Sequence, residues 1–189
     1  RLTFLTVQRR DLEESRERLM KVIAEIDATC KEKFLTAFEA IKREFQDLFV
    51  RLFDGGDTQL TLEDPTDVLE SGIEVHVTIP GKRNQNLLQL SGGERALTAL
   101  SLLFAMLRVK PSPFVVLDEI DAPLDEANVG RYSDVLRDFT ADTQFLIVTH
   151  NKGTMEAADV LYGVTMEKAG VSKIVSVRLA DHHHESVKT

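Results

Sequence analysis

Neither proline nor glycine occurs in the first 53 residues, and the first glycines follow at Gly55 and Gly56. Because proline and glycine are the residues that most readily interrupt a helix, this stretch predicts one long helix. Its first half has an aliphatic residue at every seventh position, namely Leu5, Leu12, Leu19 and Ile26. That spacing is typical of one seam of a coiled coil, although Arg9 and Arg16 occupy companion positions.

The apolar spacing continues in the second half of the stretch, shifted by one residue and with bulkier side chains: Phe34, Phe38, Ile41, Phe45, Leu48 and Leu52. The shift falls between Asp27 and Lys33. We therefore predict that residues 1–33 form a strand of a coiled-coil arm and that the helix then docks on a folded core. The alternative is a long surface helix that packs along its own domain.

The pattern changes after the two glycines. Alternating apolar residues at 60–62 and 73–79 predict two antiparallel strands joined by a polar loop. Helical spacing returns over 96–108 and again over 129–139, and the wholly apolar runs 114–117 and 145–148 flank the second of these helices. Strand, helix, strand is the arrangement of an α/β sheet, and runs of this kind predict parallel strands buried on both faces. Residues 160–166 and 173–179 supply two last strands.

Charge excludes one class of function. The chain carries a net charge of −8, while its first 53 residues are close to neutral at +1. Indiscriminate binding of duplex DNA over the whole surface is therefore not expected, although a local basic patch remains possible. With one cysteine, Cys30, no charged and apolar leader, and no long uncharged apolar run, we expect a cytoplasmic protein without a membrane segment.

The first candidate functional segment is Ser91-Gly92-Gly93-Glu94, which lies directly before a predicted helix. Glycines let backbone amides approach an anion closely, Ser91 can cap the helix, and the positive end of the helix favours a phosphate. The simpler interpretation is a turn and a helix cap.

Three further positions lie at strand ends or next to them. Asp118 and Glu119 end the first apolar run, where α/β proteins bind ligands, so Asp118 could hold Mg²⁺ while Glu119 orients or deprotonates a water. Asp125 can cap the following helix. His150 ends the second run and could donate to a phosphate oxygen. Alternatively, these are solvated acids, a cap and a structural histidine.

The order of these segments resembles the ATP-binding-cassette (ABC) ATPases, with a signature motif, Walker B, D-loop and H-loop in sequence. The flanks, among them Gly92–Leu100, Val116–Ala122, Thr149–Lys152 and Leu161–Met166, look like the C-terminal head segment of a bacterial SMC (structural maintenance of chromosomes) protein. The resemblance implies an α/β fold: the C-terminal half of an ABC-type head, with a mostly parallel sheet, flanking helices and an antiparallel part, preceded by a coiled-coil helix. It also implies an arm at 1–33, a head lobe at 34–180 and a flexible tail at 181–189.

The resemblance further implies ATP and Mg²⁺ as cofactors. Asp118 would serve the metal, and Glu119 and His150 would be catalytic. Ser91, Gly92, Gly93 and Glu94, with Asp125 near the join, would face ATP bound to a second head. Hydrolysis between the two heads would drive chromosome condensation and segregation, and the expected partners are DNA and a kleisin subunit in a nucleoid-associated complex in the cytoplasm.

A phosphate-cradling loop of the form G-x-x-x-x-G-K-S/T occurs nowhere in the 189 residues. In the SMC family that loop and the Q-loop belong to the N-terminal half of the head. We therefore expect the chain to need that half and to be inactive alone. The alternatives are a DNA-repair coiled-coil ABC ATPase and a kleisin-docking module. We interpret His182-His183-His184 as part of the tail and assign no metal to these residues.

Overall fold

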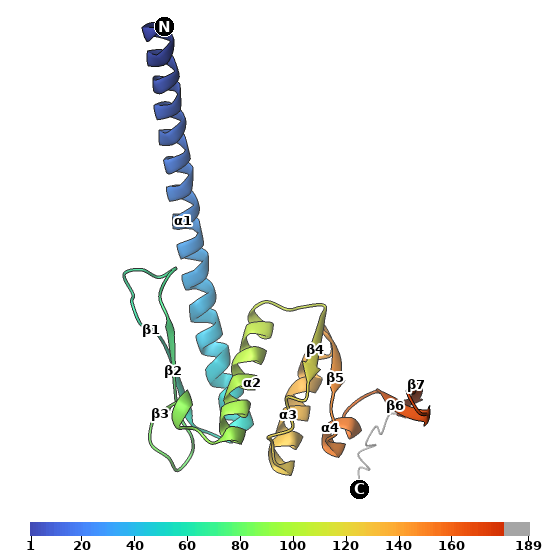
Figure 1. Cartoon of the computed structure of the whole chain (residues 1–189). Helices are drawn as coiled ribbons and strands as arrows, with labels where there is room; N and C mark the ends of the chain where they lie inside the picture. The colour runs from blue at the N-terminus through green and yellow to red at the C-terminus, as the bar shows by residue number, and fades with distance from the viewer. Residues whose placement is uncertain (180–189) are drawn as a thin grey trace.

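The computed structural model describes residues 1–179, and its dominant feature is a single helix that extends far beyond the rest of the molecule (Figure 1). The tail at 181–189, its three histidines, and residue 180 lie outside the described residues. The elements in chain order are α1 (Leu2–Phe53), β1 (Asp57–Leu62), β2 (Ile73–Thr78), β3 (Gln85–Asn86), the 3₁₀ helix η1 (Leu87–Gln89), α2 (Gly92–Val109), β4 (Phe114–Asp118), α3 (Glu126–Phe139), β5 (Gln144–Val148), α4 (Lys152–Glu156), β6 (Val160–Lys168) and β7 (Val171–Arg178).

The two halves of α1 have different surroundings. Every residue from 1 to 33 is exposed, whereas the second half buries Phe38, Phe45, Leu48, Phe49 and Leu52. The alternative in which the whole helix packs along its own domain is therefore wrong, because the first half is exposed throughout. The helix ends where Asp54 adopts a left-handed conformation with φ of 58°, as the glycines that follow predicted.

Gly56 is required at this turn for two reasons. Its φ is +94°, a region that other residues rarely adopt, and a Cβ atom there would lie 2.4 Å from the carbonyl oxygen of Thr78. The turn thus brings β1 against β2, and the two strands pair antiparallel with Leu60 opposite Val75. The predicted pair of strands is confirmed. The two-residue strand β3, which pairs with β2, was not predicted.

The lower part of α1 packs on α2 and α3, and buried aromatic rings fill the junction. Phe45, Phe49 and Phe104 are fully buried, and the Phe104 ring stacks on Phe139 of α3 with centroids 5.3 Å apart. Burying one such side chain contributes about 1.5–3 kcal/mol to stability. This core joins the base of the arm to both helices.

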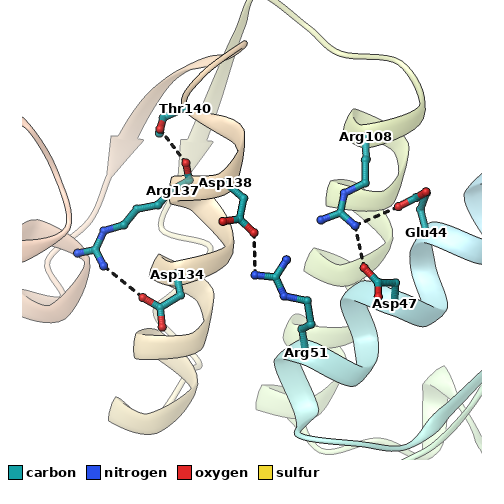
Figure 2. A network of polar contacts seen from close by, with 8 residues as sticks. All are labelled: Glu44, Asp47, Arg51, Arg108, Asp134, Arg137, Asp138 and Thr140. Atoms are coloured by element: carbon teal, nitrogen blue, oxygen red, sulfur yellow. Dashed lines mark hydrogen bonds and ion pairs between the residues drawn. The ribbon is translucent and has the colours of Figure 1, made fainter.

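Ion pairs border the same junction (Figure 2). Arg108 of α2 contacts Glu44 at 3.0 Å and Asp47 at 2.8 Å, both on α1. Arg51 of α1 contacts Asp138 of α3 at 2.7 Å. Pairs this open to solvent contribute at most about 1 kcal/mol each, so they set the orientation of the helices more than the stability.

The parallel pair β4–β5 corrects one prediction. The strands pair as expected, with Val116 opposite Leu146, but they are not buried on both faces. Leu117 is buried and Val115 partly so, whereas Phe114, Val116, Leu146 and Val148 are 65%, 56%, 58% and 49% exposed. The helices of the described chain cover only one face of this two-stranded sheet. Its other face is an uncovered apolar surface.

The two predicted last strands are confirmed, and they form a hairpin. β6 and β7 pair antiparallel, with a register irregularity between Met166 and Lys168, and they lie at the opposite end of the molecule from the free end of α1 (Figure 1). Tyr162 and Ile174 are 66% and 68% exposed. None of the helices in the described part of the chain combines the length and apolar character that crossing a lipid bilayer requires.

Candidate functional site

The carboxyl ends of β4 and β5 lie side by side and carry three of the predicted site residues. Parallel pairing sets Asp118 opposite Val148, so Glu119 and the Thr149-His150 pair emerge from the same edge of the sheet. The Nδ1 atom of His150 lies 3.9 Å from the Oε1 atom of Glu119. The structure therefore brings together a carboxylate and an imidazole that are 31 residues apart in the sequence.

Glu119 has an unusual backbone conformation. Its φ is 50°, in the left-handed region, where few residues other than glycine are found. The conformation is held by two hydrogen bonds: the Glu119 N–H donates to the Val148 carbonyl at 2.9 Å, and the Ala122 N–H donates to the Glu119 carbonyl at 3.2 Å. The turn directs the Glu119 side chain away from the strand and into solvent. An exposed carboxylate beside an exposed imidazole can hold a water and move its proton.

Asp118 fits the requirements of Mg²⁺. It is exposed at the last position of β4. No group of three or more metal-binding side chains gathers anywhere in residues 1–179. Mg²⁺ does not need such a group, because it is usually bound by one or two carboxylates together with substrate phosphates and water. Asp118 is therefore suited to holding Mg²⁺ that arrives with a phosphate ligand.

The Ser91–Glu94 segment forms the predicted helix cap. Ser91 is the N-cap of α2: its Oγ accepts from the Glu94 N–H at 3.4 Å, and the Glu94 carboxylate accepts from the Ser91 N–H at 3.0 Å. Lys82 donates to the same carboxylate at 2.7 Å. This hydrogen bond, together with the one from the Ser91 N–H, lowers the pKa of Glu94. Glu94 thus holds Ser91 in place, and the Ser91 hydroxyl remains exposed.

Two glycines of this segment differ in their surroundings. A Cβ on Gly92 would meet nothing within 4 Å, whereas one on Gly93 would lie 2.9 Å from the Pro123 carbonyl oxygen. The start of α2 therefore touches the loop that leads into α3. At the end of that loop Asp125 caps α3, as predicted, by accepting from the Asn128 N–H at 2.8 Å. Ser91 and Asp125 are both exposed, and the Gly93–Pro123 contact links the helix start to the loop that ends at Asp125.

Asp121 is a buried residue beside the candidate site that the sequence analysis did not predict. It is 1% exposed, and its Oδ2 accepts hydrogen bonds from Thr149 Oγ1 at 2.6 Å and from Thr154 Oγ1. Burial, and after it the Asp121 carboxylate, raise the pKa of Tyr132. No sequence signal marks this residue, because aspartate is normally exposed and its partners lie far along the chain.

Comparisons with known proteins identify a family and several similar proteins. The family model described as the RecF/RecN/SMC N-terminal domain matches residues 7–173. The chain is similar to "Chromosome partition protein Smc" of Desulfitobacterium hafniense (strain Y51), with 55% identity over 179 residues, which are 95% of this chain but 15% of that protein. The chain thus spans less than a fifth of the length of this relative.

Two solved structures are also similar. One is an Smc head domain with an extended coiled coil derived from Pyrococcus furiosus, bound to the C-terminal domain of ScpA; it is 41% identical, has a TM-score of 0.77, and the match covers 92% of this chain and 44% of that one. The other comes from work on the ATP-driven dimerization and DNA-stimulated activation of SMC ATPases; it is 41% identical, has a TM-score of 0.71, and the match covers 78% of this chain and 89% of that one.

Proposed function

The chain belongs to the RecF/RecN/SMC N-terminal domain family, and from that premise we propose that it is the C-terminal half of an SMC ATPase head that binds and hydrolyses ATP with the N-terminal half. The observation that carries the proposal is the placement of Asp118, Glu119 and His150 at the adjoining ends of β4 and β5, with Glu119 and His150 3.9 Å apart. Within it, residues 1–33 are the returning arm, 34–180 the head lobe and 181–189 the tail.

The uncovered face of β4 and β5 supports the need for a second half. Phe114, Val116, Leu146 and Val148 expose apolar side chains on one side of a parallel pair, a kind of sheet that proteins normally cover on both faces. The phosphate-cradling loop, absent from these 189 residues, is assigned to the same partner, together with the Q-loop. The N-terminal half would thus complete both the sheet and the nucleotide site.

The residues then have distinct roles. Asp118 holds Mg²⁺, which when bound neutralises charge on the phosphates. Glu119 aligns the attacking water with the γ-phosphorus and accepts a proton from that water. His150 donates a hydrogen bond to a γ-phosphate oxygen, where negative charge must be stabilised during transfer. Since Glu119 and His150 are exposed, both can reach a ligand without rearrangement of the core.

Ser91, with the Gly92 and Gly93 amides, faces the nucleotide held by a second head. The Ser91 hydroxyl and the α2 N-terminus offer donors to phosphate, and Glu94 keeps the cap in place. The contact between Gly93 and the Pro123 loop supports a single interface that includes Asp125. ATP gripped from both sides joins the heads, and loss of the γ-phosphate releases them.

The biological role follows from the similar proteins. We assign the chain to chromosome condensation and segregation in the cytoplasm. There α1 would transmit the opening and closing movement of the heads to bound DNA. A similar Smc head was solved with the C-terminal domain of ScpA, so a kleisin subunit is the second expected partner. The similarity to chromosome partition proteins favours this role over a DNA-repair ATPase. A docking role for the kleisin is compatible with it, because one head can both hydrolyse ATP and bind a partner.

Reconstitution tests the proposal. The 189-residue chain alone is expected to show no ATP hydrolysis, because its sequence contains no G-x-x-x-x-G-K-S/T loop. Mixing it with the N-terminal half should restore hydrolysis, measured as release of inorganic phosphate. The control is the same mixture with Glu119→Gln in the C-terminal half, which should stay inactive. Hydrolysis by the chain alone would contradict the proposal.

A further inference from the structure

The loops that follow β4 and β5 are joined to each other at two points. The first is a backbone bond, from the Glu119 N–H to the Val148 carbonyl at 2.9 Å. The second is a side-chain bond, from Thr149 Oγ1 to Asp121 Oδ2 at 2.6 Å. The backbone bond thus reaches the last residue of β5, and the side-chain bond reaches the residue that follows it.

The second bond matters because the reacting side chains have little support of their own. The side chains of Glu119 and His150 are 62% and 74% exposed, so no packing fixes their separation, which depends on their backbones. With the backbone bond alone, the Glu119 loop could pivot about a single point. The Asp121–Thr149 bond adds a second point and fixes the angle between the two loops.

Asp121 is placed to do this at low cost. A buried carboxylate is unfavourable unless hydrogen bonds compensate it, and two hydroxyl donors reach the same Oδ2. The donors differ in what they connect. Thr149 precedes His150, and its Oγ1 also accepts from the Asn151 N–H at 2.9 Å, so it holds the backbone on both sides of His150. Thr154 lies in α4 and anchors only that helix.

We propose that Asp121 is a positioning residue that sets the separation of Glu119 and His150 through Thr149. The inference rests on the function proposed above. It assigns to a buried residue a task in hydrolysis that does not involve contact with the nucleotide. The Leu124 N–H donates to the Asp121 backbone carbonyl at 3.0 Å, in the loop that ends at Asp125. The same buried anchor therefore also holds the loop proposed to lie near the second head.

The chain offers a matched pair of variants. Thr149→Val and Thr154→Val each remove one hydroxyl that donates to Asp121 Oδ2 and keep the side-chain volume. In the longer protein that carries this chain, both should lower the midpoint of thermal unfolding, and Thr149→Val should do so more because it also removes the acceptor of the Asn151 N–H. Only Thr149→Val should lower kcat, by about tenfold, with KM within about twofold of the parent value, because only it loosens His150. Thr154→Val should keep the parent kcat.

Replacements of Asp121 itself provide a rescue test. Asp121→Ala removes the acceptor for both threonines and should lower kcat by about 100-fold. Asp121→Asn keeps a carbonyl oxygen that can accept from Thr149, so it should restore most of that loss. Equal effects of Thr149→Val and Thr154→Val on kcat, or no effect of either, would overturn the positioning role.

The same assay separates this inference from the proposed function. Glu119→Gln is measured alongside the other variants. A large loss of kcat in Glu119→Gln without a loss in Thr149→Val overturns the role of Asp121 alone. Unchanged kcat in Glu119→Gln overturns the proposed site and, with it, the role of Asp121.

Discussion

Replacing Glu119 by glutamine in the complete head is expected to leave ATP binding intact and to lower the hydrolysis rate by between about 100-fold and 10,000-fold. Glutamine has nearly the same size and can still form hydrogen bonds, but it cannot accept a proton from water. Because the γ-phosphate then persists, heads joined by ATP should accumulate. Single-turnover hydrolysis measures the first effect, and light scattering in the presence of ATP measures the second.

A matched variant controls for the loss of charge. Glu156, the last residue of α4, is also exposed, and it does not lie at a strand terminus. Glu156→Gln removes the same charge and should hydrolyse ATP at the parent rate. Hydrolysis at the parent rate by Glu119→Gln would remove the basis for assigning this residue to the water.

The second large effect concerns Ser91. Ser91→Arg places a long cationic side chain at the exposed N-cap of α2, on the surface proposed to meet the other head. We expect each head to bind ATP normally, since Asp118 and His150 are untouched, but joining of heads should be lost. Combined with Glu119→Gln, which otherwise accumulates joined heads, the variant should give only single heads by light scattering with ATP.

Loss of the helix cap must be separated from loss of joining. Replacing a capping serine costs about 1 kcal/mol, so Ser91→Arg should be slightly less stable than the parent. Ser91→Thr keeps both the hydroxyl and the cap, and it should form joined heads. Normal ATP-dependent joining by Ser91→Arg would refute the role of this surface, and failure of Ser91→Thr to join would point to the cap instead.

Local chemistry made much of the fold predictable. The end of α1 could be read from Gly55 and Gly56, because the turn needs a residue that tolerates positive φ. The starts of α2 and α3 could be read from Ser91 and Asp125, whose short polar side chains accept from the first free amides of a helix. These signals depend on residues within a few positions of one another, so they are visible in the sequence.

Other features depend on distant partners or on very short elements. α4 has only five residues, fewer than two helical turns, so it shows no apolar period. The apolar runs of β4 and β5 indicate burial, but they do not say which polypeptide covers each face. Asp121 accepts hydrogen bonds from Thr149 and Thr154, which lie 28 and 33 positions further along the chain. Its burial therefore follows from the tertiary fold and has no local cause.

The same division applies to the site. The sequence predicted Asp118, Glu119 and His150 at the ends of two strands, and the parallel pairing of those strands places both ends at one edge of the sheet. The left-handed turn at Glu119 was not predicted, because glutamate has no preference for that conformation. The turn is imposed by the Val148 and Ala122 hydrogen bonds, and it brings the carboxylate to the histidine.

The most direct test is an experimental structure of the reconstituted head, carrying Glu119→Gln and saturated with ATP and Mg²⁺. We predict that one triphosphate is contacted by Asp118 and His150 of one copy and by Ser91 of the other. A structure in which Ser91 and Asp118 of the same copy surround one nucleotide, with no contribution from a second copy, would contradict the account.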